Sequence, residues 1–402
     1  MLWRVALRRN RLKVPAKPVN LKIADTSTKE NIMSEKMKLG FIGCGGFSSG
    51  NHIPNAAANP EFEIRAFCDL NKAHLEELSA KYKPSYITDD MEKVISDPEV
   101  ELVICGTKPD FRLPIMKLAV KHKKHLFVEK PLCFKEEEVN EMVSLMNKAP
   151  IKFMVGFNRP YSPMMQDLKP LYNKNKKGNT TIIFRIVGEG QLWPAHHYNA
   201  VMRDKESTII HEITHIFDLL NWLTDLYPQR VYTAGEGNVD NVITLNYPDN
   251  ITAVIIAGDN STAGFPKERI EINTNYGTIV GDHFVELSAI GYGKPFYKTY
   301  DYKIAGKTYN TSGLEAAKKC EEWRSSVTEE EIKKGYYYER QVKVDKGHYN
   351  ELDIFRKIIR AGGASQTDVI KGAVANLIAW RAIESWEKAI PVNLDFSYLE
   401  KL

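Results

Sequence analysis

Short apolar runs alternate with helix-like stretches from Lys38 to about Phe157. Five of these runs have the length and composition of buried strands, namely Lys38–Ile42, Phe62–Cys68, Glu101–Gly106, His125–Val128 and Lys152–Gly156. The stretches between them carry helical patterns, for example Asn71–Tyr82, Leu113–Lys121 and Lys135–Asn147. Strands that alternate with helices form parallel sheets covered on both faces. We therefore predict an α/β domain with a parallel, doubly wound sheet over residues 37–157.

The pattern changes after Gly156, where strand-like segments follow one another with turns between them. These segments are Thr180–Val187, Arg230–Ala234, Asn241–Leu245, Thr252–Ala257, Arg269–Thr274 and Thr278–Gly281. They predict an α+β domain over residues 158–402 with a large open antiparallel sheet. Helices are expected at about Glu212 to Leu223, Tyr349–Ala361 and Asp368–Ala389, and the last could pack back on the first domain. The Tyr-, Lys- and Glu-rich segment from Lys294 to Lys346 is expected to be an inserted loop and helix region.

The positive charge of the chain is concentrated at its beginning. The net charge is +4 at pH 7, but the first 36 residues hold nine Lys or Arg and three Asp or Glu, which leaves about −2 for the rest. This nearly neutral body gives no electrostatic case for a nucleic-acid partner. No apolar run approaches the roughly 18 residues that cross a bilayer, so no membrane partner is expected. We expect residues 1–36 to be a disordered basic leader or the product of a start codon assigned too early; a targeting peptide is the alternative.

Cysteine usage indicates the compartment. The chain has five cysteines without CxxC spacing, namely Cys44, Cys68, Cys105, Cys133 and Cys320, and four of them lie in apolar or strand-like segments. Buried free thiols in a reducing compartment explain this pattern better than disulfides or a zinc site. We therefore expect a cytoplasmic location and no metal.

The first apolar run leads into a glycine-rich turn, Leu39-Gly-Phe-Ile-Gly43-Cys-Gly45-Gly-Phe-Ser48. Gly43 would permit the tight turn, Gly45 would let the backbone approach a pyrophosphate, and Ser48 is small enough for close helix–strand packing. Asp69 ends the next strand, at the spacing of a carboxylate that binds ribose hydroxyls and repels a 2′-phosphate. These residues predict NAD as the cofactor rather than NADP. An ordinary strand–turn–helix, with Asp69 as a cap, is the alternative.

Four segments together resemble the Gfo/Idh/MocA family of oxidoreductases. They are Gly43-Cys-Gly-Gly through His52-Ile-Pro54, then Glu129-Lys130-Pro131, then Gly156-Phe-Asn-Arg159 with Tyr161-Ser-Pro163, and His215-Ile-Phe-Asp218. The resemblance runs from about Lys38 to Val392, and this version looks most like the oxidoreductase half of bidomain inositol-dehydrogenase-like proteins. It implies a Rossmann domain and an open antiparallel sheet that makes the interface of a homodimer or homotetramer. It also implies hydride exchange between nicotinamide and a secondary alcohol of a sugar or cyclitol.

The resemblance also implies roles for individual residues. Lys130 would sit beside the nicotinamide and polarise the substrate hydroxyl, and His215 would be the general acid/base, because an imidazole titrates near working pH. His211, His215 and Asp218 are spaced to share one helix face. A solvated lysine and a histidine at a helix–sheet contact are the alternatives. The expected cofactor-binding residues are Gly43, Gly45, Gly46, Phe47, Ser48, Asp69, Thr107, Asp110, Glu129, Lys130, Asn158 and Arg159.

The substrate side departs from the family. Most members have an acidic residue four positions before the catalytic histidine, where this chain has His211 with Glu212 beside it. Arg112 likewise stands where many members have histidine. Substrate binding is assigned to Tyr161, to His197 with its neighbour His196, and to His211 and Glu212. The segment from His211 to His215 also spells the HExxH pattern of zinc peptidases, but no third-ligand motif follows it.

We therefore predict an NAD-dependent oxidoreductase that acts on a secondary hydroxyl of a small-molecule sugar, sugar derivative or cyclitol. One alternative is a glycoside hydrolase or eliminase that oxidises the sugar transiently. Another is a catalytically silent dinucleotide-binding regulator, because Rossmann folds need not be catalytic.

Overall fold

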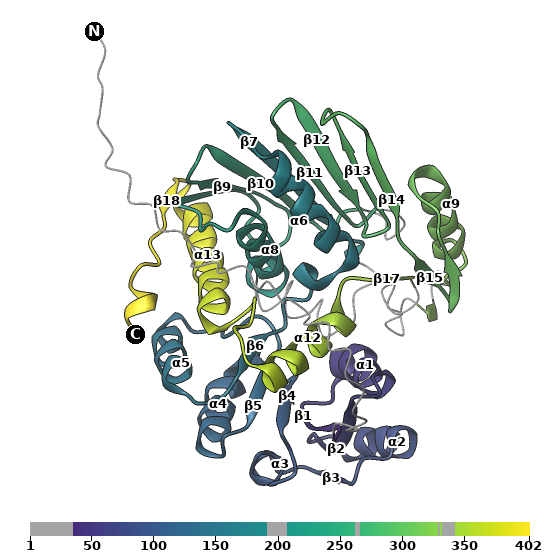
Figure 1. The fold of residues 1–402 in the computed structure, drawn as a ribbon, viewed down its shortest axis with the longest axis vertical. Helices are drawn as coiled ribbons and strands as arrows, with labels where there is room; N and C mark the ends of the chain where they lie inside the picture. Colours follow the sequence, from purple (N-terminus) through teal and green to yellow (C-terminus); the bar gives the residue numbers. More distant parts are fainter. Residues whose placement is uncertain (1–34, 191–206, 262–265, 329, 332–341) are drawn as a thin grey trace, which may run out of the picture.

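The computed structural model describes residues 35–190, 207–261, 266–328, 330–331 and 342–402. Two large sheets dominate it, one in the lower and one in the upper half of Figure 1. The sequence prediction of the fold class is confirmed. Among the described residues, no helix has both the length and the apolar character that crossing a membrane needs.

The lower sheet has six parallel strands in the order β3-β2-β1-β4-β5-β6. This is the strand order of a dinucleotide-binding Rossmann domain, in which ligands bind at the carboxyl ends of the strands where the order reverses. The strands are β1 (Met37–Ile42), β2 (Phe62–Cys68), β3 (Tyr86–Thr88), β4 (Leu102–Cys105), β5 (His125–Val128) and β6 (Phe153–Val155). The central strands are buried on both faces, so the apolar runs in the sequence are continuous rather than alternating.

Helices cover both faces of this sheet (Figure 1). They are α1 (Ile53–Ala58), α2 (Lys72–Tyr82), α3 (Met91–Ser96), α4 (Arg112–Lys121) and α5 (Glu136–Lys148). Short helical turns lie before α1 and α4, namely η1 (Ser48–His52) and η2 (Pro109–Phe111). Helix α5 has three glutamates in its first turn and a lysine at its end, which suits the helix dipole. The sequence prediction gave no bounds for β3, α1 and α3, although it expected a helix after the glycine turn.

The upper sheet has nine strands in the order β14-β13-β12-β11-β7-β10-β9-β8-β18. It is antiparallel except for the parallel pair of β7 and β10. Inward and outward side chains alternate along most strands, as in β9, so one face is buried. The strands are β7 (Thr180–Val187), β8 (Arg230–Gly235), β9 (Asn241–Tyr247), β10 (Ile251–Gly258), β11 (Glu268–Thr274), β12 (Gly277–Asp282), β13 (Glu286–Ile290), β14 (Phe296–Thr299) and β18 (Val392–Asn393).

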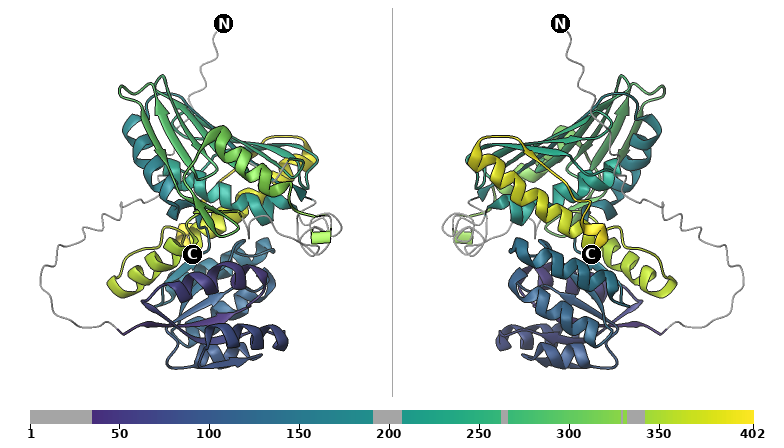
Figure 2. Two further views of the ribbon diagram at one scale, coloured as in Figure 1. Left: turned by 90° about the vertical axis from the view of Figure 1, so that its right-hand side faces the viewer. Right: turned by 90° about the vertical axis from the view of Figure 1, so that its left-hand side faces the viewer.

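Three helices lie across one face of the nine-stranded sheet, namely α6 (Pro163–Asn175), α8 (Thr214–Thr224) and α13 (Val369–Lys388). Helix α13 and the preceding α12 (His348–Ala361) lie at the junction of the two sheets (Figure 2). Arg381 of α13 pairs with Glu136 of α5, and Arg356 of α12 pairs with Glu61. The end of the chain therefore packs against the parallel-sheet part. Three further turns are η3 (Arg159–Tyr161), η5 (Ile209–Ile213) and η6 (Leu399–Lys401).

The segment from Lys294 to Lys346 differs from the prediction of a loop and helix region. It contains a three-stranded sheet of β16 (Lys307–Tyr309), β15 (Tyr302–Ile304) and β17 (Val342–Val344), together with the helix α9 (Gly313–Arg324) and the strand β14. These strands are only three or four residues long and contain Lys residues, most of them exposed, so they lack the apolar run of a core strand.

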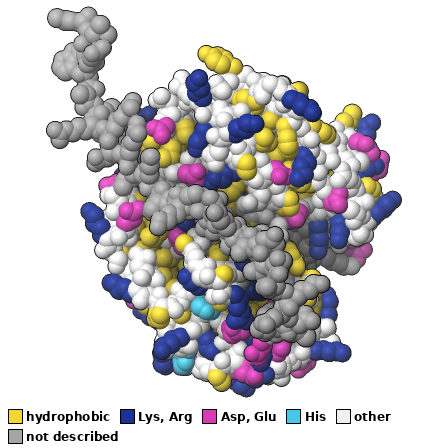
Figure 3. All heavy atoms as spheres, in the orientation of Figure 1, with side chains coloured by type: hydrophobic (Ala, Val, Ile, Leu, Met, Phe, Trp, Pro, Cys, Tyr) yellow, Lys and Arg dark blue, Asp and Glu magenta, His cyan; other side chains and the backbone are white. Residues whose placement is uncertain are grey.

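All five cysteines are buried and free, as the sequence predicted. On the face drawn in Figure 3, basic and acidic side chains of the described residues are intermixed rather than segregated. This distribution agrees with the nearly neutral charge of the chain after its first 36 residues.

Candidate functional site

The turn after β1 is held against the loop after β4 by close backbone contact. Gly43 has a φ of +82°, and a Cβ atom there would lie 2.7 Å from backbone atoms of Gly106 and Thr107. A Cβ atom on Gly106 would overlap Ser48 Oγ. Gly45 differs, because a Cβ there would have no atom within 4 Å. The turn therefore leaves space at Gly45, at the start of a helical segment, as a bound pyrophosphate requires.

Asp69 directly follows β2 and is half-buried beside this turn. Its Oδ2 accepts the N–H of Cys44 at 2.8 Å, and its Oδ1 accepts the N–H of Asn71 at 3.0 Å. The N-cap of α2 is Asn71, whose side chain accepts the N–H of His74 at 3.2 Å. Asp69 therefore ties the end of β2 to the glycine turn and is not the cap of α2. The glycines and Asp69 together fit a bound dinucleotide.

A buried pair fixes the backbone in front of Lys130. His52 is fully buried, and its Nε2 lies 2.5 Å from Glu129 Oε1. Glu129 Oε2 accepts the N–H of Lys130 at 3.2 Å. Burial alone would raise the pKa of Glu129, but the hydrogen bond to His52 and the charges of His52, Lys130 and Arg112 hold it below 4.5. A Cβ at Gly156 would lie 2.7 Å from Glu129 Oε1, so a larger residue there would displace the Glu129 side chain.

Lys130 reaches across from the end of β5 to the upper half of the molecule. Its Nζ donates to the backbone carbonyl of His211 at 2.7 Å and lies 3.4 Å from Glu212 Oε2. Both partners belong to η5, a π-helical turn that leads into α8. Such turns are frequent at functional sites. His211 lies in η5, whereas His215 and Asp218 lie in α8, so the segment predicted as one α-helix passes from a π-helical turn into an α-helix.

His215 lies in the first turn of α8 and is 5% exposed. Its ring packs edge-on against Phe157 with 5.7 Å between the ring centres, and its Nδ1 has no hydrogen-bond partner among the described residues. Burial and the positive charges of Arg159 and Lys130 lower the pKa of His215 well below 6.5. The imidazole is therefore neutral at neutral pH and able to accept a proton. Asp218 is also buried, and burial raises its pKa well above 3.8.

A chain of charged side chains continues from Lys130 into the upper sheet. Arg159 Nη2 lies 3.3 Å from Glu212 Oε1, and Arg159 donates to both oxygens of Glu268 at 2.8 and 2.9 Å. Lys346 Nζ lies 2.9 Å from Glu268 Oε1. Burial would raise the pKa of Glu268, but the charges of Arg159 and Lys346 hold it well below its usual range. Lys130, Glu212, Arg159, Glu268 and Lys346 are called the charge chain below.

Three residues near Lys130 were missed by the sequence analysis or given no role there. Glu268 occupies an inward position of β11, in step with Ile270 and Ile272, and a charge at such a position is a signal that the pattern offered. Asn376 of α13 is fully buried and pins the turn after Lys130, because it accepts from the N–H of Leu132 at 2.9 Å and donates to the carbonyl of Cys133 at 2.6 Å. In the sequence, Asn376 stands among apolar residues of a predicted helix, and a polar residue in such a place is a signal that could have found it.

Arg112 is the third of these residues. It is 2% exposed, and its Nη2 lies 3.3 Å from the backbone carbonyls of both Thr107 and Lys130. It therefore joins the loops that follow β4 and β5. Thr107 takes part in this contact through its backbone.

The remaining predicted site residues lie in different surroundings. Asn158 Nδ2 donates to the carbonyl of Lys346 at 2.8 Å, which places it beside the charge chain. Gly46 and Phe47 are exposed at the glycine turn, and Asp110 is exposed after β4. Tyr161 is 1% exposed and its hydroxyl lies 3.4 Å from Thr367 Oγ1, so this side chain is part of the core.

Two further expectations concern histidines. The ring of His211 packs against Phe134 with 5.1 Å between ring centres, while its carbonyl contacts Lys130. His196 and His197 lie outside the described residues. Among the residues that the structure describes, no group of three His, Cys, Asp or Glu side chains could hold a metal ion.

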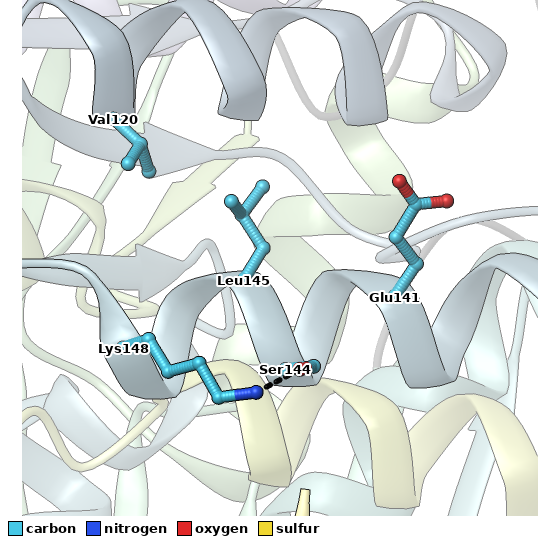
Figure 4. A pocket seen from close by; sticks show the side chains of 5 residues that line it. All are labelled: Val120, Glu141, Ser144, Leu145 and Lys148. Atoms are coloured by element: carbon cyan, nitrogen blue, oxygen red, sulfur yellow. Dashed lines mark hydrogen bonds between the residues drawn. The ribbon is translucent and has the colours of Figure 1, made fainter.

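A surface hollow lies elsewhere, between α4 and α5 (Figure 4). It is lined by Val120, Glu141, Ser144, Leu145 and Lys148, and Lys148 Nζ donates to Ser144 Oγ at 2.8 Å. These residues lie on the helices that cover the parallel sheet, away from the carboxyl ends of the strands. The hollow is therefore separate from the candidate site.

Comparisons with known proteins show what this chain is similar to. A family model described as an oxidoreductase family with an NAD-binding Rossmann fold, GFO_IDH_MocA, matches residues 37–157. The chain is 24% identical over 265 residues to a myo-inositol 2-dehydrogenase of Thermotoga maritima, which covers 63% of this chain and 78% of that protein.

Two solved structures have the same fold. An oxidoreductase from Agrobacterium radiobacter, in complex with NAD+, L-tartaric acid and magnesium, matches with a TM-score of 0.71 at 15% identity, over 89% of this chain and 98% of that one. An apo scyllo-inositol dehydrogenase from Lactobacillus casei matches with a TM-score of 0.69 at 16% identity, over the same shares. The glycine turn and the Glu129-Lys130-Pro131 segment both lie in the part of the chain that matches this family model, so residues 37–157 are similar to the NAD-binding Rossmann domain of the GFO_IDH_MocA oxidoreductases.

Proposed function

We propose that this protein transfers hydride between NAD and a secondary hydroxyl of a sugar, sugar derivative or cyclitol, with Lys130 and His215 as its catalytic residues. The observation that carries the proposal is the 2.7 Å contact of Lys130 Nζ with the backbone of η5, the turn that leads into the helix of His215. This contact supports the proposal because it joins Lys130, after β5, to the turn that precedes the helix of His215. The charges of Lys130 and Arg159 act on His215 there.

The chemistry follows from the state of these groups. Oxidation of a secondary alcohol releases the hydroxyl proton, and the neutral, buried imidazole of His215 can accept it. The Lys130 ammonium can donate a hydrogen bond to the hydroxyl oxygen and stabilise negative charge that develops there. NAD, when bound, supplies the hydride acceptor. Glu129 and Asn376 hold the backbone around Lys130 and so orient its side chain.

NAD rather than NADP is proposed from Asp69. Its carboxylate stands beside the glycine turn, where it would accept from ribose hydroxyls and repel a 2′-phosphate. In Asp69→Ala, the ratio of the dissociation constants of NADP and NAD should be smaller than in the unaltered protein. Equal dissociation constants of the two cofactors for the unaltered protein would contradict this assignment.

The test of the whole proposal is NADH formation by the purified full chain with NAD. The substrates offered are myo-inositol, scyllo-inositol, D-xylose and D-glucose. NADH formation with each of them is followed by its absorbance. Net NADH accumulation with one of these substrates supports the proposal. Product release from a glycoside without net NADH would indicate transient oxidation and elimination instead.

The assembly is proposed to be a homodimer or homotetramer through the nine-stranded sheet. Tyr232, Val242 and Ile256 are exposed apolar side chains at outward positions of β8, β9 and β10, on the face opposite the buried one. A cluster of this kind favours association. Light scattering coupled to gel filtration measures the mass, and a monomer at micromolar concentration would contradict this assembly.

A further inference from the structure

Both peptide groups of Cys44, in the glycine turn after β1, are held by side chains from the segment that follows β2. The N–H of Cys44 donates to Asp69 Oδ2 at 2.8 Å, and its carbonyl oxygen lies 2.9 Å from Nε2 of His74. A carbonyl oxygen can only accept a hydrogen bond, so Nε2 of His74 is the donor in this contact. The glycine turn therefore has two supports, and His74 is the one that the predicted site did not include.

His74 lies in the first turn of α2, and its position there is fixed by the helix. Its backbone N–H donates at 3.2 Å to the side chain of Asn71, the N-cap of α2. Its Nδ1 lies 3.5 Å from Oε2 of Glu77, one turn further along the helix. Each ring nitrogen thus faces a polar group, Nδ1 on its own helix and Nε2 on the glycine turn. The half-buried imidazole therefore links α2 to the glycine turn.

The contact with His74 sets the direction of the Gly45 N–H. The carbonyl of Cys44 and the N–H of Gly45 belong to the same peptide group, which is planar and trans. In such a group the two bonds point in opposite directions, so a carbonyl held by His74 turns the N–H of Gly45 away from α2. Among the described residues this N–H has no acceptor, and the space where a Cβ of Gly45 would stand is open. The N–H is therefore available to an anionic group bound beside the turn.

We propose that His74 is a positioning residue for NAD, because by holding the Cys44 carbonyl it keeps the Gly45 N–H directed at the pyrophosphate of the bound cofactor. The inference rests on the NAD binding of the proposed function. Rotation of the peptide between Cys44 and Gly45 changes the φ of Gly45, which a glycine permits over a wide range. Without His74 the N–H would sample several directions, and NAD would bind more weakly because this freedom is lost on binding.

The test is the dissociation constant of NADH for the purified full chain and two variants, measured by the fluorescence of NADH without any substrate. His74→Leu and His74→Gln are similar in size, but only His74→Gln keeps an N–H donor at about the reach of Nε2. His74→Leu should bind NADH about tenfold more weakly, in the range of one hydrogen bond to a charged group. His74→Gln should stay within about twofold of the unaltered protein.

A matched control is Glu76→Ala, which alters an exposed side chain of the same helix and should leave the dissociation constant unchanged. Urea unfolding shows that each variant is folded. Binding by His74→Leu as tight as by Glu76→Ala would overturn the inference. An equal loss in His74→Leu and His74→Gln would also overturn it, because the imidazole ring and not its donor would then matter. In both cases the proposed NAD binding stands, whereas absence of NADH binding by the unaltered protein would overturn both.

Discussion

The proposed site has a cofactor edge and a substrate edge, and their residues are arranged differently along the chain. The cofactor edge is a run of consecutive small residues, in which Gly43 permits a close backbone approach and Gly45 leaves space. The substrate edge is His215 together with the charge chain, whose five side chains come from segments as far apart as Lys130 and Lys346. Changes at the cofactor edge should therefore act on binding or on local backbone strain. Changes at the substrate edge should act on turnover, or on the folding of the whole molecule.

The largest expected effect is on turnover at the substrate edge. Lys130→Ala or His215→Ala should lower kcat by roughly 10²–10⁴, the usual range for acid–base groups, because the proton acceptor or the polarising charge is lost. NAD binding should survive, since neither residue belongs to the glycine turn. Steady-state kinetics and NAD titration measure the two quantities.

Lys121→Ala is the control for this pair of variants. Lys121 lies at the end of α4 and its side chain is 64% exposed, so both quantities should stay unchanged. Turnover of Lys130→Ala and His215→Ala close to that of Lys121→Ala would reject the assigned roles.

The second effect is on folding, through the buried end of the charge chain. Glu268→Ala leaves Arg159 and Lys346 without the carboxylate that both contact inside the protein. Loss of one partner of a buried ion pair typically costs about 3–5 kcal/mol of the free energy of unfolding. Urea unfolding measures it.

A surface ion pair provides the comparison. Glu141→Ala removes a carboxylate that lies 2.6 Å from Lys117 Nζ, with both side chains 53% exposed, and should cost less than about 1 kcal/mol. Equal losses in Glu268→Ala and Glu141→Ala would show that the charge chain is not a buried structural element.

The third effect separates two glycines within the cofactor edge. Gly43→Ala places a Cβ at 2.7 Å from backbone and forces a positive φ, which should cost about 1–3 kcal/mol of stability. Gly45→Ala meets no protein atom, so stability should change by less than about 0.5 kcal/mol. It should nevertheless weaken NAD binding about tenfold or more, since the methyl group occupies space that the pyrophosphate needs. Thermal unfolding and NAD titration would refute the contrast if the two variants behaved alike.

The same contrast explains what the sequence could predict. Gly43, Gly45 and Asp69 were found because the cofactor edge is local: a strand, a turn and a carboxylate at a set spacing. Lys130 and His215 were singled out by a family resemblance and not by pattern. Glu268 and Asn376 contact residues 109 and 243 or 244 positions away, respectively, and no local signal pairs such positions.

The sequence did not predict the short elements, for a related reason. The strands β15, β16 and β17 are three residues each, and they pair with one another rather than with the main core. A period of two cannot be detected over three residues. The π-helical turn η5 was missed because its sequence is compatible with an ordinary α-helix, while the contact with Lys130 comes from another part of the chain.

The last expected effect concerns Glu351, a buried carboxyl group that belongs to neither edge. Glu351 lies in the first turn of α12, is fully buried, and neither carboxyl oxygen has a partner among the described residues. Burial, with a contribution from the charge of Glu129, raises the pKa of Glu351 well above 4.5. In the unfolded chain the carboxyl ionises near 4.5, while in the folded protein it keeps its proton to higher pH.

The sign of the pH dependence follows from this difference. Where the unfolded chain binds fewer protons than the folded protein, stability falls as pH rises, so the full contribution of Glu351 is present below about pH 4.5 and is lost as pH rises through the folded-state pKa. Each unit of the upward shift corresponds to about 1.4 kcal/mol. Glu351→Gln cannot ionise, so its stability relative to the unaltered protein should increase between about pH 5 and pH 8. Urea unfolding at the two pH values measures the difference in stability, and Glu322→Gln, at an exposed position, is the control. Parallel pH profiles of Glu351→Gln and the unaltered protein would mean that the buried carboxyl group is ionised in the folded state.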